Sequence, residues 1–292
     1  MTSAPVDQTP AAPRRAAVVG SPVAHSLSPV LHTAAYRALS LTGWTYDRVE
    51  ADAAALPELV GSLDASWAGL SVTMPGKQAA LAVAARATPR AVAVGAANTL
   101  VRQEAGWHAD CTDVDGVTGA LRAAAGFTRA GDTPGVVLGA GGTACAAVAG
   151  LAELGVQVVR VVVREPRRAE AVVRCGSELG VAVDLVRWAG ADLAALAADA
   201  AVLVNTTPAA AVEDVVDDLA AAACVLDVIY HPWPTPLSVA VAARGGRLAT
   251  GLDMLLHQAF GQVEQFTGLR APRAEMRDAL WTATGGILPL PL

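Results

Sequence analysis

A lysine and an aspartate in the first half of the chain have the chemistry to pass a proton. Lys77 follows the apolar run Leu70–Val72 and opens a predicted helix, and Asp113 ends the run Asp110–Asp113. A cation at a helix N-terminus opposes the helix dipole, so Lys77 either reaches solvent or has a function there. In a closed pocket, desolvation favours the neutral amine and a nearby carboxylate favours the ammonium. Such a pair could exchange a proton with a substrate hydroxyl, although spacing alone leaves the pairing open.

Two serines upstream of the lysine could form an anion pocket. Ser26 and Ser28 lie two apart in Gly20–Pro29, just past a predicted strand. Side chains two apart in an extended segment point the same way, so both hydroxyls could donate to one carboxylate. A second interpretation is that Ser28 only caps the helix that begins at Pro29. The spacing leaves both interpretations open.

A glycine turn in the middle of the chain predicts a dinucleotide site. It follows the apolar strand Gly135–Leu138 and precedes the helical stretch Thr143–Leu154. Glycines let the backbone turn tightly and approach a pyrophosphate, and the N–H groups at the helix start then face the anion. The turn consists of Gly139, Ala140, Gly141 and Gly142, with Thr143 next.

The end of the next predicted strand, Val156–Val163, should select the cofactor. Arg164 and Arg168 could bind a 2′-phosphate, whereas Glu165 could accept hydrogen bonds from a free 2′-hydroxyl. Because arginines outnumber the single glutamate here, the sequence favours NADP over NAD.

The elements that must position these groups alternate between apolar β-type runs and alanine-rich helical stretches. This alternation predicts an α/β protein with parallel sheets and helices on both faces, in two blocks. The predicted strands are 16–20, 44–49, 68–72 and 97–101, then 135–138, 156–163, 182–187, 201–205 and 224–229. The predicted helices are 29–41, 56–63, 77–87, 114–125, 143–154, 252–267 and 272–284.

Composition excludes several function classes. The chain of 292 residues is 53% hydrophobic and 16% charged, with a net charge of −6 and no basic block, which argues against nucleic acid as a partner. No apolar run reaches the ~18–20 residues of a membrane span, and Met1–Pro13 lacks the pattern of a signal peptide. The four cysteines have no paired spacing and the histidines no metal-ligand spacing, so we expect no metal site and a cytoplasmic protein with reduced thiols.

Short motifs recur along nearly the whole chain from about Ala16 onward. They are GSPVAHSLSP (20–29), VTMPGK (72–77), GAANTL (95–100), TD (112–113), GAGG (139–142), NTTP (205–208), DVIY (227–230) with TPL (235–237), and GLDML (251–255) with Gln258. In this order they resemble the shikimate 5-dehydrogenase family. The resemblance implies a two-domain enzyme that interconverts 3-dehydroshikimate and shikimate with NADP(H), in aromatic amino acid biosynthesis.

The resemblance also implies roles for individual residues. Lys77 and Asp113 would be the catalytic pair. The substrate would be held by Ser26 and Ser28 at its carboxylate, by Thr73, Asn98 and Gln258 at ring hydroxyls, and by Tyr230. The cofactor would meet Gly139, Ala140, Gly141, Gly142, Thr143, Arg164, Arg168, Asn205, Thr206, Gly251 and Met254.

The implied domains are a substrate-binding α/β domain, 15–113 with 252–292, and a Rossmann-like doubly wound NADP-binding domain, 114–251, after a loose tail over 1–14. The expected partner is the small-molecule substrate, with no nucleic acid and no membrane, in a monomer or homodimer.

Three positions depart from the family pattern. Ser71 and Cys111 each stand where an asparagine is common, and Glu165 stands where a small polar residue often follows the arginine. Cys145 occupies the stretch that usually carries an arginine after the glycine turn. Two alternatives stay open beside the family interpretation, and Glu165 is the best support for the first of them. One is an NAD-preferring quinate/shikimate dehydrogenase, and the other is a catalytically silent relative that binds a metabolite.

Overall fold

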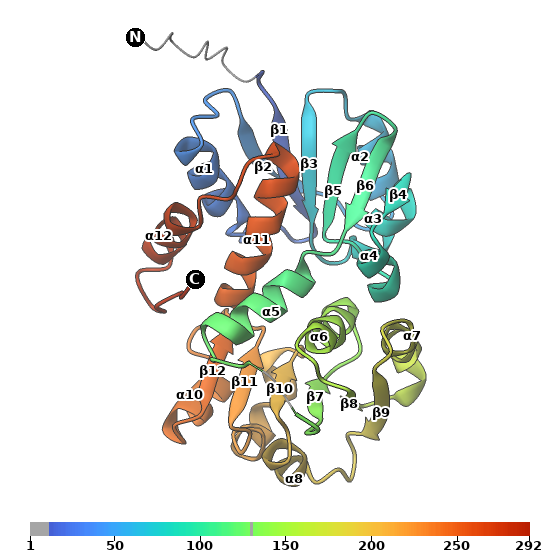
Figure 1. Ribbon diagram of the computed structural model, residues 1–292, viewed down its shortest axis with the longest axis vertical. Coiled ribbons are helices and arrows are strands. Elements are labelled where there is room, and N and C mark those ends of the chain that lie inside the picture. The colour runs from blue at the N-terminus through green and yellow to red at the C-terminus, as the bar shows by residue number, and fades with distance from the viewer. Residues whose placement is uncertain (1–11, 129–130) are drawn as a thin grey trace, which may run out of the picture.

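The computed structural model describes residues 12–128 and 131–292, and its strands form two six-stranded sheets, one above the other in Figure 1. The predicted tail therefore lies outside the described residues except for 12–14. The α/β class with two sheets was predicted from the alternating pattern and is confirmed.

The first sheet is mixed, not parallel throughout. Its strand order is β2-β1-β3-β5-β6-β4, and β5 runs antiparallel to both β3 and β6. The prediction of a parallel sheet is wrong here because β5 and β6 form an antiparallel hairpin. The sequence does not indicate this hairpin, since the connecting pair Glu104-Ala105 carries no typical turn signal. Strands β4 and β6 were not predicted. The strands are β1 (Arg15–Gly20), β2 (Thr45–Glu50), β3 (Trp67–Val72), β4 (Arg86–Ala87), β5 (Thr99–Gln103) and β6 (Gly106–Asp110). We call the part of the molecule built around this sheet the first half, and the part built around the other sheet the second half. The helices of the first half are α1 (Ser28–Ala38), α2 (Leu56–Ser62), α3 (Lys77–Val83) and α4 (Pro89–Val94).

The second sheet is parallel throughout, in the order β12-β11-β10-β7-β8-β9. Its central strands are buried on both faces, as parallel strands covered by helices must be. Strand β12 was not predicted. The strands are β7 (Gly135–Leu138), β8 (Val158–Val163), β9 (Ala182–Arg187), β10 (Val202–Asn205), β11 (Cys224–Asp227) and β12 (Arg247–Thr250). The helices are α6 (Gly142–Glu153), α7 (Glu170–Glu178), α8 (Leu193–Ala198), α9 (Val216–Leu219) and α10 (Pro236–Ala243), with short 3₁₀ turns at Pro166–Ala169, Ala209–Ala211 and Glu213–Val215.

Two helices, α5 (Asp113–Ala123) and α11 (Gly251–Thr267), join the halves: α5 lies between the two sheets, and α11 runs from β12 up across the first sheet (Figure 1). They pack closely because α5 presents glycine to α11: a Cβ at Gly116 would meet the Met254 carbonyl oxygen at 2.8 Å. The last helix, α12 (Arg273–Ala283), follows and lies beside α1.

The last helices complete the apolar core of the first half. Leu252, Leu256 and Phe260 of α11 share one buried cluster with Val18 of β1 and Leu31 of α1. The first half is therefore assembled from both ends of the chain, with the second half inserted between them.

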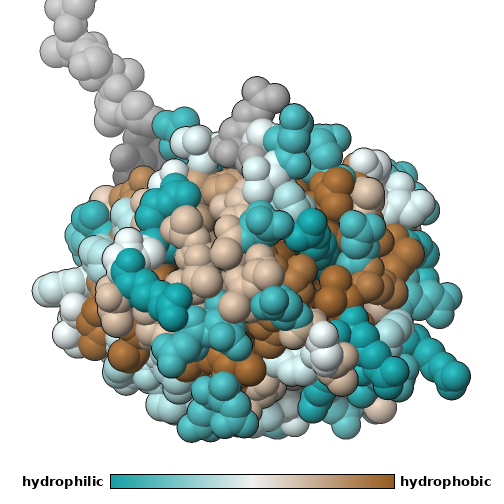
Figure 2. All heavy atoms as spheres, turned by 90° about the horizontal axis from the view of Figure 1, so that it is seen from below, coloured by the Kyte–Doolittle hydropathy of each residue, from teal (hydrophilic) through white to brown (hydrophobic). Residues whose placement is uncertain are grey.

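The outer surface mixes hydrophilic and hydrophobic residues on the face seen from below (Figure 2). Among the described residues, no helix combines the length and apolarity that a membrane crossing needs.

Candidate active site

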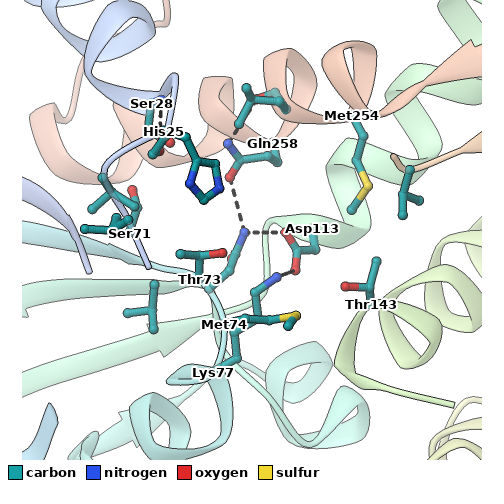
Figure 3. Close-up of a pocket in the computed structure, with 18 of the residues that line it drawn as sticks. His25, Ser28, Ser71, Thr73, Met74, Lys77, Asp113, Thr143, Met254 and Gln258 are labelled. Carbon is teal, nitrogen blue, oxygen red and sulfur yellow. Dashed lines mark hydrogen bonds and ion pairs between the residues drawn. The ribbon is translucent and has the colours of Figure 1, made fainter. Parts of the chain in front are cut away.

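One cavity, which we call the lysine cavity, lies between the halves and has a volume of about 390 Å³. It gathers residues from the ends of β1 and β3, from the start of α5 and from one face of α11 (Figure 3). Eleven residues of the predicted site line it: Ser26, Ser28, Thr73, Lys77, Asn98, Asp113, Thr143, Tyr230, Gly251, Met254 and Gln258.

Lys77 and Asp113 form an ion pair inside this cavity. Lys77 Nζ donates to Asp113 Oδ2 at 2.5 Å, and the two side chains are only 17% and 8% exposed. Lys77 opens α3 and Asp113 opens α5, so the two helix starts bring distant residues together. Asp113 suits its place, since an anion is favoured at a helix N-terminus.

The ion pair sets the charge state of the amine. Burial lowers the pKa of Lys77, but the charge and hydrogen bond of Asp113 outweigh burial, and the pKa stands above its ordinary value. The ammonium form therefore dominates at neutral pH, and the cavity holds one available proton.

The other Asp113 oxygen is held by an amide. Asn98 Nδ2 donates to Asp113 Oδ1 at 2.9 Å and lies 3.2 Å from Gln258 Oε1. The Asn98 oxygen accepts in turn from the backbone N–H of Thr112 at 2.7 Å. Because both Asp113 oxygens have donors, the carboxylate is fixed in orientation.

The two serines lie at the far side of the cavity, Ser26 in the loop between β1 and α1 and Ser28 at the start of α1. Arg48 donates to the Ser26 carbonyl at 2.6 Å, and Glu50 accepts from the Ser21 hydroxyl at 2.7 Å, so β2 clamps this loop. The capping interpretation of Ser28 is wrong: Leu27 is the N-cap residue, and Ser28 is already the first residue of α1. The Ser28 N–H instead lies 3.3 Å from the Ser26 hydroxyl oxygen.

A second cavity, the glycine cavity, lies in the other half and has a volume of about 730 Å³. The turn after β7 lines it, where Gly139 has a φ of +104°, a conformation that favours glycine. A side chain at Gly141 would meet nothing within 4 Å, so the turn is open to a ligand. The turn leads directly into α6, whose N-terminus favours an anion. The lining includes Gly139, Ala140, Gly141, Arg164, Glu165, Arg168 and Trp188.

The remaining predicted cofactor residues lie elsewhere. Thr143, Gly251 and Met254 line the lysine cavity, and Thr143 follows directly after the glycine turn in the chain. Asn205 is fully buried and bonds protein groups, accepting from the Thr207 N–H at 3.0 Å and donating to Asp227 at 3.0 Å. The Thr206 hydroxyl donates to the Leu138 carbonyl at 2.7 Å. We therefore expect Asn205 and Thr206 to act on a cofactor through the turns that they hold.

Sequence reasoning missed Gln262, a polar residue that lines the lysine cavity. Gln262 is 1% exposed; its Oε1 accepts from the Ser71 hydroxyl at 2.7 Å, and its Nε2 donates to the Asn98 carbonyl at 3.1 Å. The available signal was its position four residues after Gln258, which places both amides on one face of α11. Within the described residues, no group of three His, Cys, Asp or Glu side chains is arranged to hold a metal ion.

A further signal for Lys77 was its rarity. It is the only lysine in the chain, and the other 20 of the 21 basic residues counted as Lys and Arg are arginines. A guanidinium hardly releases its proton in proteins, whereas a lysine ammonium can. Among the lysine and arginine side chains of this chain, Lys77 is therefore the one that can readily give up a proton.

The chain is similar to known dehydrogenases in sequence. Residues 18–100 match a family model described as shikimate dehydrogenase substrate binding domain, and residues 251–280 match one described as shikimate 5′-dehydrogenase C-terminal domain. A shikimate dehydrogenase (NADP(+)) of Methylobacterium radiotolerans is 41% identical over 280 residues, which cover 91% of this chain and 96% of the relative.

Solved structures are similar as well. The crystal structure of Mycobacterium tuberculosis shikimate dehydrogenase has a TM-score of 0.86 and is 54% identical, covering 92% of this chain and 100% of that one. The Thermus thermophilus shikimate 5-dehydrogenase, crystallised with NADP(H) and shikimate, has a TM-score of 0.76 and is 31% identical, covering 92% and 99%.

Proposed function

Because the chain belongs to the shikimate dehydrogenase family, we propose that it reduces 3-dehydroshikimate reversibly to shikimate and that Lys77 and Asp113 handle the proton. The NADP-dependent shikimate dehydrogenase function, within the shikimate pathway, rests on relatives that are 36–41% identical over most of the chain. The direction and the catalytic residues are our proposal. The ion pair between Lys77 and Asp113, inside a cavity between the halves, is the observation that carries it.

The glycine cavity fits NADP in its donors and its charge. The open turn at Gly141 and the N-terminus of α6 suit a pyrophosphate, and Arg164 and Arg168 line the same cavity with guanidinium groups suited to a 2′-phosphate. Glu165 also lines it, but two cations against one carboxylate favour the phosphorylated cofactor. When bound, the cofactor supplies the hydride chemistry.

The residues of the lysine cavity would hold the substrate and one proton. Ser26 and Ser28 would bind the carboxylate, while Thr73, Asn98 and Gln258 would bind ring hydroxyls. Lys77 would give the proton on Nζ to the oxygen of the carbonyl being reduced, and would take it back in oxidation. Asp113 would orient the ammonium through its hydrogen bond and favour the charged form of Lys77 by raising its pKa.

The silent-relative alternative is disfavoured by the same geometry, since Lys77 and Asp113 are in contact and line the cavity. The domain boundaries, 15–113 with 252–292 and 114–251, stay a prediction, as does the choice between monomer and homodimer. Rates with shikimate and quinate, each with NADP⁺ and NAD⁺, measure how strict the substrate and cofactor preferences are.

The test of the proton role is Lys77→Ala. We expect kcat to fall by about 10²–10⁴, because a positioned proton donor contributes that much, while the affinity for NADP⁺ is retained. The matched control is Arg86→Ala, an exposed cation of the same half, which should keep its activity. Equal kcat in Lys77→Ala and the parent protein would remove Lys77 from the mechanism.

A further inference from the structure

The short segment that carries Asp113 is fixed by a buried carboxylate before it. Asp110, the last residue of β6, is 3% exposed. Its two oxygens accept five hydrogen bonds, from Thr88 Oγ1 at 2.7 Å, Arg90 Nε at 2.8 Å, Arg90 Nη2 at 2.6 Å, the Cys111 N–H at 2.8 Å and Gln265 Nε2 at 2.7 Å. The start of the segment is therefore tied to α4 and α11.

The same guanidinium also holds the other end of the segment. Arg90 Nη1 donates to Asp115 Oδ1 at 2.9 Å, and Nη2 lies 2.8 Å from Asp115 Oδ2. Arg90 thus bridges Asp110 and Asp115, which lie on either side of Asp113 in the chain. A planar fork with several donors can do this, whereas a lysine presents a single point of charge.

Charge reinforces this bridge. Burial raises the pKa of Asp110, but hydrogen bonds from Arg90 and Thr88 outweigh burial and hold the pKa at about 2. Glu153 on α6 also faces the cluster, and burial together with the Asp115 charge raises its pKa. Arg90, Asp110 and Asp115 lie outside the lining of the lysine cavity, so their route to the reaction is through Asp113.

We propose that Arg90 is a positioning residue for the reaction: by binding Asp110 and Asp115 together, it fixes the β6–α5 junction and thereby the Asp113 carboxylate against Lys77. Asp113 and Asp115 share the first turn of α5, so releasing Asp115 releases the turn that carries Asp113. The inference rests on the proposed catalytic role of Lys77 and Asp113.

Asp115→Asn is the variant that separates positioning from folding. Asp115 is 39% exposed, so this change leaves the buried contact of Arg90 with Asp110 in place. We expect kcat to fall about tenfold with an unchanged KM for NADP⁺, since small displacements of reacting groups cost rates of this order or more. Asp115→Glu, which keeps the carboxylate, should recover most of the activity. The control is Asp199→Asn, an exposed partner of Arg160 at 3.8 Å in the other half, which should change nothing.

The single lysine provides a second readout. Protein labelled with ¹⁵N on the lysine side chain gives one Nζ signal, and its titration reports the pKa of Lys77 directly. The charged or titratable groups that act on Lys77 are Asp113 and Cys111, and neither is changed in Asp115→Asn. We expect the pKa of Lys77 to fall toward its ordinary value in this variant and to be restored in Asp115→Glu.

The outcomes distinguish the two proposals. An active Lys77→Ala protein overturns the proposed function. If Lys77 is essential but Asp115→Asn keeps both its kcat and the parent pKa of Lys77, Arg90 has no positioning role and the inference fails. A loss of melting temperature in Asp115→Asn without a change in the Lys77 signal also overturns it, because that result assigns Arg90 to stability alone.

Discussion

His32 is a buried, uncharged imidazole behind the lysine cavity. It is 0% exposed and stacks on Tyr46, with ring centroids 4.0 Å apart, and its Nε2 lies 3.3 Å from Gln262 Oε1. Burial lowers the pKa of His32 to about 3, although the hydrogen bond with Gln262 acts in the opposite direction. The neutral ring is therefore part of the polar layer that holds Gln262.

His32 makes the folded state sensitive to acid. Between pH 6.5, the ordinary histidine pKa, and about pH 3, the unfolded chain binds a proton at this site that the folded chain does not. Its contribution to the free energy of unfolding thus falls with decreasing pH, by up to about 1.4 kcal/mol per pH unit. Urea unfolding at pH 7, 6, 5 and 4 should show a shallower decline in His32→Gln than in the parent protein. Parallel declines in the two proteins contradict this expectation.

The residues that would bind or react were more predictable from the sequence than the residues that hold them in position. Lys77, Asp113 and the serines stand in sequence contexts that restrict their roles, and the structure places all of them in one cavity. The contacts of Gln262 and Arg90 join distant segments, and a side-chain hydrogen bond leaves no local pattern in the sequence. Their function as supports therefore required the structure.

At the scale of elements, the start of α11 connects the last strand of the second sheet, β12, to a helix that lines the lysine cavity. Thr250 caps the helix with a capping box: its hydroxyl accepts from the Asp253 N–H at 3.4 Å, and Asp253 accepts from the Thr250 N–H at 2.8 Å. The cap sets the rotation of α11, which directs Met254, Gln258 and Gln262 into the lysine cavity at intervals of one turn.

Removing the cap should cost both stability and activity. We expect Thr250→Ala to lower the free energy of unfolding by about 1 kcal/mol, as the loss of an N-cap hydroxyl does elsewhere. The KM for shikimate should rise as well, since Gln258 lies on the same helix. Thr250→Ser keeps the hydroxyl and is the control. Denaturant unfolding and initial rates measure both effects, and an alanine variant as stable as the serine variant would contradict them.

Buried apolar strands were predicted from the sequence, whereas two strands with polar residues, β6 and β12, were not. Strands β7, β10 and β11 of the second sheet are buried apolar runs, which sequence patterns indicate directly. Strand β6, with His108 and Asp110, and strand β12, which begins at Arg247, contain polar residues, so neither has the composition of a buried strand. Each is identified by the neighbouring strand with which it pairs.

At the scale of the whole molecule, the two cavities have no lining residue in common: the glycine cavity is lined by the second half alone, and the lysine cavity mostly by the first half, with Thr143, Val228 and Tyr230 from the second. This arrangement suits two ligands that are bound by different residues. Each ligand should therefore bind, and stabilise the protein, without the other.

Ligand-dependent melting tests this independence. Shikimate or NADP⁺ at one hundred times its Kd should each raise the free energy of unfolding by about 2.7 kcal/mol. In the double variant Ser26→Ala with Ser28→Ala, the effect of the same shikimate concentration should shrink while the effect of NADP⁺ persists. Loss of the NADP⁺ effect alone would assign the serines to the wrong ligand.

The return of α11 and α12 to the first sheet has a consequence for biosynthesis. A ribosome releases β1 to β6 first, but these strands lack Leu252, Leu256 and Phe260, which fill their core, until translation is nearly finished. The second sheet, by contrast, has all its strands by Thr250. The half that is translated first is thus completed last, and its exposed apolar face must wait for the final helices.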